Sequence, residues 1–261
     1  MSALFRLDGC SAFVSGAAGH LGREMSAALC EAGAHVILNG RDESRLKDFA
    51  GEMRAQNHSV DVAAFDVADS ERVRHFFGRI ERLDVLVNNA VSMTPRPFDE
   101  LSVADFAVTY ASAVSAAFEA VRAARPALER AAQLRGEASV VNVASMYGLV
   151  APDARLYADA AQQSPFHYGP AKAALLQLTR HLAAELGRQR IRVNALVPGP
   201  FPKGAVAAGD SDFVRRLSEK TMLGRIGSAV EIRGPLLFLA APASSFVTGA
   251  ALRTDGGWTA W

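Results

Sequence analysis

The most constraining feature of the sequence is an alternation, from end to end, of short apolar runs with longer helical patterns. The apolar runs are rich in Val, Ile and Ala and alternate poorly with polar residues, as expected of strands buried on both faces. Repeated strand–helix–strand units predict an α/β fold, with a parallel sheet, right-handed crossovers and helices on both faces. The seven predicted strands are 12–14, 34–38, 60–65, 85–87, 139–143, 191–197 and 251–253.

Helical patterns fill the intervals between these runs, including 23–32, 43–56, 103–132 and 171–188. No linker, low-complexity tract or composition shift divides the chain, so we expect a single domain over residues 1–261. Half of the residues are hydrophobic, which suffices for one large core. In such sheets ligands bind at the carboxyl ends of the strands, so the residues after each strand are the candidates for a site.

Charge and cysteine content argue against several classes of partner. The 28 basic and 27 acidic residues leave a formal charge of +1, which favours neither nucleic acid nor a membrane surface. The only cysteines, Cys10 and Cys30, lack a metal-ligand spacing and favour a reducing compartment. No apolar run approaches the roughly 20 residues of a membrane span. We expect a cytoplasmic protein that acts on a small molecule, without a membrane or nucleic-acid partner.

A glycine-rich turn follows the first predicted strand and leads into a helical pattern. It contains Gly16, Gly19 and Gly22. Glycine permits close approach of a ligand, and the free N–H groups of the helix start favour an anion such as a pyrophosphate. Glycine-rich turns also form plain strand-to-helix connections, so the residues at the other strand ends are needed to distinguish a binding site from such a connection.

The end of the second predicted strand carries Arg41, where dinucleotide folds choose between cofactors. An acidic residue here suits the ribose hydroxyls of NAD, whereas an arginine suits the 2′-phosphate of NADP. Arg41 therefore favours NADP, with NAD as the alternative. A second interpretation is a surface arginine that pairs with Asp42 or Glu43. After the third strand, Asp66 is a candidate acceptor for an adenine amino group.

Two further strand ends carry polar side chains with structural and functional interpretations. Asp69 or Ser70 is expected to cap the helix that follows the third strand. Asn88 and Asn89, after the fourth strand, can tie neighbouring strand ends together or contact a cofactor, and both roles can hold.

Ser145 follows the fifth strand, and Tyr168 and Lys172 lie four residues apart further on. Residues at this spacing share one face of a helix. Pro170 is tolerated only in a first turn, which places Tyr168 at the helix start, where the dipole helps to stabilise a phenolate. A neighbouring ammonium would lower the tyrosine pKa from about 10 and make it a general acid/base. The alternative is a partly buried tyrosine with a snorkelling lysine.

Taken in order, these motifs resemble the short-chain dehydrogenase/reductase family over the whole chain. The matching residues are Gly16, Gly22, Asp66, Asn88–Ala90, Ser145, Tyr168, Lys172, Pro198–Gly199 and Asp255–Gly257. The resemblance implies a doubly wound Rossmann sheet and hydride transfer between NAD(P)(H) and a carbonyl or alcohol. It also implies an acid/base role for Tyr168, a ribose-binding and pKa-lowering role for Lys172, and a substrate-orienting role for Ser145.

The family pattern also suggests the cofactor contacts and the assembly. The expected cofactor-binding residues are Gly16, Gly19, His20, Leu21, Gly22, Arg41, Asp66, Val67, Asn89, Ala90, Tyr168, Lys172, Pro198 and Gly199. Most members are dimers or tetramers packed through long helices and the last strand, so the resemblance implies a homodimer or homotetramer. Segment 246–250 resembles part of that last strand.

Two departures concern the cofactor and the proton path. His20 stands where single-domain members usually have glycine, and it either approaches the phosphates or points to solvent. The family's helix asparagine, which helps to hold a proton relay, is replaced by Ala113. This change predicts slower turnover, with Ser112 or Ser115 as candidate substitute hydroxyls.

A third departure is an insertion around residues 152–164, between Ser145 and Tyr168. It is expected to form a loop over the substrate pocket, with Tyr157 and Arg155 as candidate substrate contacts, although packing on the surface is the commoner alternative for such residues. Segment 201–222 resembles the family's substrate lid. On it, Lys203 and Arg215 are candidates for an anionic substrate, although a solvated helix face accounts better for Arg215.

The function predicted from these features is NADP-preferring oxidoreduction of a small ketone and a secondary alcohol. The ending 257–261 and the run 39–41 are similar to gluconate 5-dehydrogenase-like members, which favours a sugar, polyol or sugar acid. Two alternatives are a non-redox dehydratase or epimerase and a catalytically weak cofactor-binding member of the family.

Overall fold

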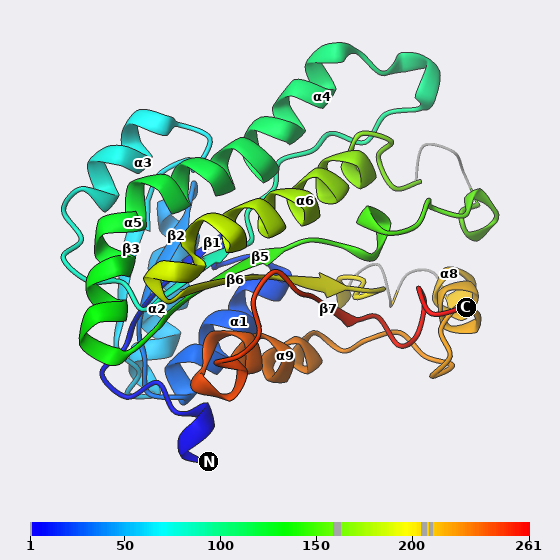
Figure 1. Cartoon of the computed structure of the whole chain (residues 1–261). Coiled ribbons are helices and arrows are strands. Elements are labelled where there is room, and N and C mark those ends of the chain that lie inside the picture. Colours follow the sequence, from blue (N-terminus) through cyan, green and yellow to red (C-terminus); the bar gives the residue numbers. More distant parts are fainter. Residues whose placement is uncertain (1, 159–162, 205–207, 209–210) are drawn as a thin grey trace.

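A parallel sheet of seven strands forms the centre of the computed structural model, which describes residues 2–158, 163–204, 208 and 211–261 (Figure 1). The strand order is β3-β2-β1-β4-β5-β6-β7, and all six pairings are parallel. The strands are β1 Ser11–Ser15, β2 His35–Gly40, β3 Val60–Ala64, β4 Val85–Asn88, β5 Ala138–Val143, β6 Ile191–Pro198 and β7 Ala251–Thr254. The predicted doubly wound α/β architecture is confirmed.

Helices cover both faces of this sheet. The described helices are α1 His20–Glu31, α2 Glu43–Ala55, α3 Ser70–Phe77, α4 Val103–Tyr110, α5 Ala116–Arg135, α6 Tyr168–Leu186, α8 Ser211–Glu219 and α9 Arg233–Ala240. Helices α1, α2 and α9 lie on one face, and α3, α5 and α6 lie on the other (Figure 1). Helix α8 lies near the carboxyl end of β7.

Strand β1 illustrates why the central strands carry apolar side chains on both of their faces. Ala12 and Val14 pack into the core beneath α1 and α9, whereas Phe13 points to the opposite face and stacks against Phe77 of α3. Because side chains alternate between the faces of a strand, a sheet covered on both sides buries every position. The carboxyl ends of β1 and β4 lie side by side at the point where the strand order reverses, which is where such folds bind ligands.

Two local predictions differ from the structure. The single helix predicted over 103–132 is α4 and α5 joined by a π-helical segment, Ala111–Ser115, and it continues to Arg135. The Ser112 hydroxyl bonds to the carbonyls of Val108 and Thr109 in this segment, and apolar periodicity does not reveal such a change of helical pitch.

The second difference concerns the last strand. Segment 246–250 is not a strand: β7 begins at Ala251, because Gly249 adopts a positive φ of 70° that no extended strand uses.

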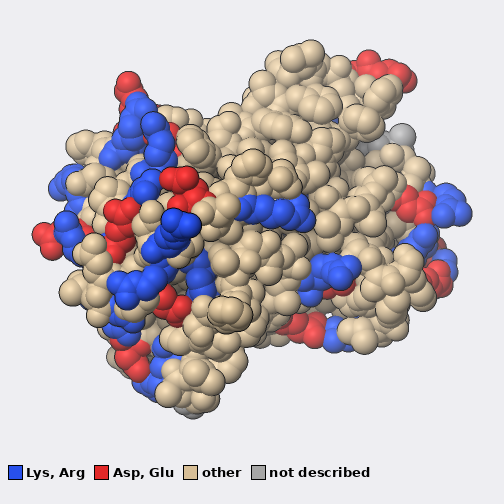
Figure 2. Space-filling model, in the orientation of Figure 1, with Lys and Arg blue, Asp and Glu red and all other residues tan. Residues whose placement is uncertain are grey.

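The face of the molecule drawn in Figure 2 has no large region of one charge sign. Figure 2 shows basic and acidic side chains interspersed on the α2 and α3 side, and few charges over α4 and α6. Within the described residues, no helix has the length and apolar character needed to cross a membrane.

Candidate active site

One cavity of about 490 Å³ lies at the carboxyl ends of the strands, and all of the predicted catalytic and cofactor-binding residues line it. They come from the turn after β1, from the ends of β2 to β6, and from the first turns of α6. The cavity therefore brings together segments that lie more than 180 residues apart in the chain, from Gly16 to Gly199. The strand-end rule identified these positions because parallel strands end at one edge of the sheet.

The glycine turn forms the base of the cavity at the start of α1. Gly16 has a φ of 65°, and a Cβ on Gly22 would lie 2.0 Å from the carbonyl oxygen of Gly16. The turn therefore requires glycine at both positions. Gly19 is the N-cap of α1 and provides no side-chain acceptor, so an anion can be bound by the free N–H groups of the first turn.

His20 is the first residue of α1 and lines the same cavity. Its Nε2 atom is buried and has no hydrogen-bond partner among the described residues. A buried imidazole nitrogen without a partner is costly, so this atom fits a site that a polar ligand completes.

The asparagines after β4 tie the strand ends together. Asn89 Nδ2 donates to the carbonyl oxygens of Ser15 at 2.9 Å and of Gly16 at 3.2 Å, which holds the glycine turn against β4. Asn88 Nδ2 donates to Asn142 Oδ1 at 2.9 Å, and this bond links β4 to β5. The tying role predicted for these side chains is therefore present.

Arg41 and Asp66 lie at the far end of the cavity, after β2 and β3. Arg41 Nη1 is 3.9 Å from Asp66 Oδ2, and both side chains are exposed. The pairing of Arg41 with Asp42 or Glu43 that the sequence allowed does not occur. Asp42 instead caps α2 through the Arg45 N–H, while Glu43 pairs with a lysine of its own helix. Asp69 caps α3, as predicted.

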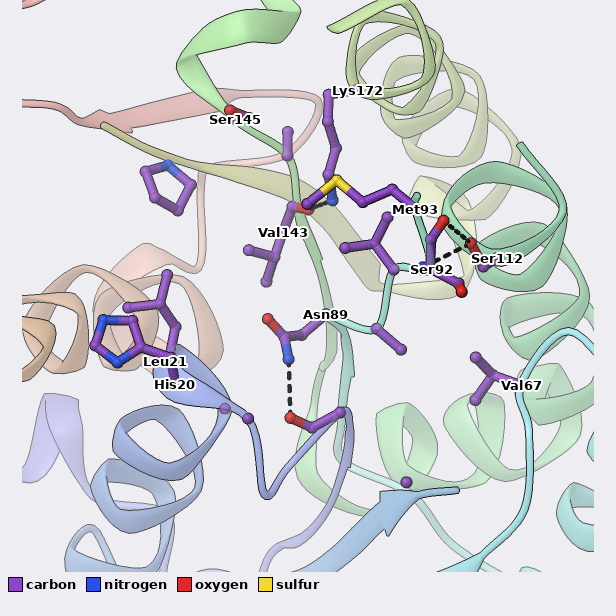
Figure 3. A pocket seen from close by; sticks show the side chains of 18 of the residues that line it. His20, Leu21, Val67, Asn89, Ser92, Met93, Ser112, Val143, Ser145 and Lys172 are labelled. Atoms are coloured by element: carbon purple, nitrogen blue, oxygen red, sulfur yellow. Dashed lines mark hydrogen bonds between the residues drawn. The ribbon is translucent and has the colours of Figure 1, made fainter. Parts of the chain in front are cut away.

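Three polar side chains meet at the other end of the cavity. Tyr168 begins α6, as Pro170 required, and Ser145 follows β5. Lys172 is buried one helical turn after Tyr168, and its Nζ lies 5.6 Å from the centre of the tyrosine ring. Lys172 Nζ donates to the Val143 carbonyl oxygen at 2.6 Å, and this bond fixes the ammonium beside the end of β5 (Figure 3).

Burial shifts the pKa of both groups on α6 toward their neutral forms. It raises the pKa of Tyr168, and a hydrogen bond with the Ser145 side chain acts in the opposite direction with a smaller effect. Burial lowers the pKa of Lys172 to about 8. At pH 7 the phenol therefore carries its proton, and the lysine remains mostly an ammonium.

Sequence reasoning missed part of the wall at this end. Val91, Ser92 and Met93 line the cavity directly after Asn89 and Ala90. They follow the end of β4, as the strand-end rule requires, but their residue types alone do not indicate a functional site. Figure 3 shows the Met93 side chain passing in front of Lys172.

The substitutes considered for the missing asparagine lie in different surroundings. Ala113 is buried and Ser115 is exposed, whereas Ser112 lines the cavity. The Ser112 hydroxyl accepts a hydrogen bond from the Ser92 N–H at 2.9 Å (Figure 3).

The insertion packs on α8, and neither of its two candidate residues lines the cavity. Arg155 is exposed and pairs with Asp153. The Tyr157 hydroxyl lies 2.9 Å from that of Tyr147, and its ring stacks on Phe213 of α8 with centroids 5.5 Å apart. These contacts hold Tyr157 outside the cavity, and Tyr157 and Arg155 show the surface packing that was the commoner alternative to substrate contact. Residues 159–162 of the insertion lie outside the described residues.

Of the two candidate residues on the predicted lid, one lies on the protein surface and the other lines the cavity. Arg215 pairs with Asp212 and Glu219 on α8, as expected for a solvated helix face. Lys203 lines the cavity, and within the described residues it has no ion-pair partner. Those residues also contain no cluster of His, Cys, Asp or Glu that could hold a metal ion.

Comparisons with known proteins find relatives that match almost the whole chain. A family model described as enoyl-(acyl carrier protein) reductase matches residues 16–259. Gluconate 5-dehydrogenase of Gluconobacter oxydans is 32% identical, and the match covers 98% of this chain and 97% of that enzyme. Galactitol 2-dehydrogenase (L-tagatose-forming) of Cereibacter sphaeroides is 35% identical, with 99% and 98% covered. A gluconate 5-dehydrogenase structure from Burkholderia cenocepacia, in complex with NADP and tartrate, matches with 30% identity and a TM-score of 0.86, with 99% and 98% covered.

The chain therefore belongs to the short-chain dehydrogenase/reductase family of oxidoreductases.

Proposed function

We propose that the protein is an NADP(H)-dependent oxidoreductase that interconverts a small ketone and a secondary alcohol. The observation that carries the proposal is the convergence of Ser145, Tyr168 and Lys172 in the cavity that also contains the glycine turn. A phenol, an ammonium and a hydroxyl that meet beside a dinucleotide cradle form an acid/base site for carbonyl chemistry.

The residues around the cavity suit a dinucleotide with a 2′-phosphate. The start of α1, with Gly16 and Gly19, would bind the pyrophosphate, and His20 Nε2 gains a partner there if it donates. Arg41 would leave Asp66 for the 2′-phosphate, and Asp66 would then accept from the adenine amino group. The NADP in the Burkholderia cenocepacia enzyme supports this assignment.

Once bound, a nicotinamide cofactor supplies or accepts the hydride. Tyr168 moves the proton, to the carbonyl oxygen in reduction and from the hydroxyl in oxidation. Burial keeps the phenol protonated, and the Lys172 ammonium, 5.6 Å from the ring centre, favours its ionisation. Ser145 would hold the substrate oxygen by a hydrogen bond.

The substrate class that fits best is a sugar, polyol or sugar acid. Relatives named for gluconate and galactitol support this class. Lys203 follows β6, lines the cavity and has no ion-pair partner in the part of the chain that is described. An ammonium in that place would pair with the carboxylate of a sugar acid.

We also propose a homodimer or homotetramer. Strand β7 is an edge of the sheet, and Val108 of α4 and Phe118 of α5 are both exposed. Unpaired strand edges and exposed apolar side chains favour association. Light scattering coupled to gel filtration tests this, and a monomeric mass at micromolar concentration would contradict it.

A substrate screen tests the proposed function. Purified protein is mixed with ketones, polyols and sugar acids, with NADP(H) and NAD(H) in turn, while nicotinamide absorbance at 340 nm is followed. We expect turnover with NADP(H) on at least one polyol or sugar acid. Product formation without net change of the cofactor would instead indicate a dehydratase or epimerase. Tight NADP binding without any turnover would indicate a cofactor-binding protein.

A further inference from the structure

A buried polar network lies directly behind the catalytic end of the cavity. It consists of His167, Thr109 and Ser112, whose exposed fractions are 0%, 0% and 7%. Thr109 lies in the last turn of α4, Ser112 lies in the π-helical segment, and His167 immediately precedes Tyr168. None of the three was needed to account for cofactor binding or proton transfer.

The network bonds to the backbone of the segment after β4. Ser112 Oγ accepts from the Ser92 N–H at 2.9 Å, and Thr109 Oγ1 lies 3.1 Å from the Ser92 carbonyl oxygen. His167 Nε2 lies 3.3 Å from the Thr94 carbonyl oxygen. Because a carbonyl only accepts, Nε2 carries the proton in this contact. His167 Nδ1 is 3.0 Å from Thr109 Oγ1, and this contact joins the two halves of the network.

These bonds hold the two residues on either side of Met93. Segment 91–97 contains no helix or strand, so its backbone N–H and C=O groups have no ladder to fix them. The Ser92–Ser112 bonds are visible in Figure 3, where the Met93 side chain crosses in front of Lys172. The position of Met93 therefore depends on the network.

The network also connects the Ser92–Thr94 segment, which forms a wall beside the cavity, to the start of α6. His167 is the residue before Tyr168, so its ring links the Thr94 backbone to the backbone that carries the phenol. A buried imidazole that contacts two elements through both ring nitrogens keeps them at a fixed separation. Met93 and Tyr168 both line the cavity, so a shift of one relative to the other would change its shape.

We propose that His167, Thr109 and Ser112 are positioning residues that fix the Ser92–Thr94 wall against Tyr168 and so set how tightly the substrate is held. This inference rests on the proposed function, because the Ser92–Thr94 wall can hold a substrate only if Tyr168 acts on one in this cavity. It predicts that loosening the network weakens substrate binding, while the chemistry of Tyr168 and the seating of the cofactor remain unchanged.

Thr109 offers a matched pair of variants. Thr109→Val has nearly the same shape but lacks the hydroxyl, whereas Thr109→Ser keeps the hydroxyl. Thr248→Val is the control, because it deletes a hydroxyl that accepts from the Val193 N–H at 3.1 Å and does not line the cavity. For each protein, hydrogen exchange over residues 91–97, the KM for substrate, kcat, and the Kd for NADP⁺ are measured.

We expect Thr109→Val to speed amide exchange over 91–97 about tenfold, raise KM about tenfold and change kcat and the NADP⁺ Kd less than twofold. Thr109→Ser is expected to restore KM to within twofold of the unsubstituted protein, and Thr248→Val to leave it unchanged. The bell-shaped pH profile of kcat should keep its limbs in all variants.

Two results would overturn the inference. Unchanged exchange over 91–97 in Thr109→Val would mean that the network does not hold the wall. Faster exchange with an unchanged KM would mean that the wall does not touch the substrate. If the unsubstituted protein turns over no compound in the screen, the proposed function fails separately, and the exchange comparison still decides whether the network fixes segment 91–97.

Discussion

The two ends of the cavity are built in different ways. At the end near α1, the site is formed mainly by backbone groups: glycines allow a close turn, and free N–H groups of the first helical turn are available to a ligand. At the end near α6, the site is formed by side chains: Ser145 follows β5, and Tyr168 and Lys172 lie on α6. A backbone site tolerates no added atoms, whereas a side-chain site can lose its chemistry without losing its shape. Substitutions at the two ends should therefore fail in different ways.

The largest expected loss of stability comes from Gly22→Ala. Its Cβ would lie 2.0 Å from the Gly16 carbonyl oxygen, and both atoms belong to a turn that cannot move freely. We expect the free energy of unfolding to fall by about 3 kcal/mol and NADP⁺ binding to be lost. Urea denaturation measures the first effect and cofactor fluorescence the second.

Gly51→Ala is the control for this substitution. A Cβ there meets nothing within 4 Å on an exposed position of α2, so stability should rise by up to about 1 kcal/mol. Equal effects of the two substitutions would show that the turn at Gly22 is not close-packed.

Arg41→Ala should separate the two cofactors. Removing the guanidinium is expected to weaken NADPH binding roughly 10- to 100-fold, or about 1.4–3 kcal/mol, because a charged hydrogen bond to the phosphate is lost. NADH affinity should stay within twofold. Calorimetric titration with each cofactor tests this, with Arg54→Ala at the other end of α2 as the control. An equal loss for NADPH and NADH would remove the 2′-phosphate assignment.

Lys172→Met should trade activity for stability at neutral pH. Burial lowers the lysine pKa from an ordinary value near 10.4 to about 8, so the folded state binds this proton less well than the unfolded state. Below pH 8 the buried charge costs about 3 kcal/mol, and losing the bond to the Val143 carbonyl costs about 1–2 kcal/mol in the variant. The variant should therefore be more stable by about 1–2 kcal/mol at pH 7.

The pH dependence of that difference has a defined sign. Between pH 8 and about 10.4 the unfolded lysine holds its proton more often than the folded one, so the stability of the unsubstituted protein rises with pH. The advantage of Lys172→Met should shrink across this window and reverse above it, as measured by denaturant unfolding at several pH values. A constant advantage across this window would mean that burial does not lower the pKa of Lys172.

The smallest expected effect comes from the insertion that rests on α8. Lys220 Nζ lies 2.7 Å from Asp153 Oδ2, and Arg216 Nε donates to the Leu156 carbonyl oxygen at 2.7 Å. Lys220→Met removes a partly exposed ion pair worth less than about 1 kcal/mol. Because none of these residues lines the cavity, we expect KM and kcat to change less than twofold, with Lys47→Met on α2 as the control for losing a surface pair. A tenfold fall in kcat would place the insertion closer to the chemistry than its contacts suggest.

The same difference between the two ends explains what the sequence could predict. Strand bounds, the glycine turn and the start of α6 depend on local patterns, so the sequence predicted them to within two residues for every strand. The π-helical segment at Ala111–Ser115 interrupts no periodicity, and therefore it was missed. Ser92 and Met93 have no residue type that marks a site. The packing of Tyr157 on Phe213 depends on a long-range contact that no local pattern contains.

The most direct test of the account is Tyr168→Phe, measured by turnover with NADP(H) on the substrate found in the screen. The phenol is the group that moves the proton, so we expect kcat to fall about 10²- to 10⁴-fold while the Kd for NADP⁺ changes less than twofold. A kcat within tenfold of that of the unsubstituted protein would contradict the central claim, because another acid would then supply the proton.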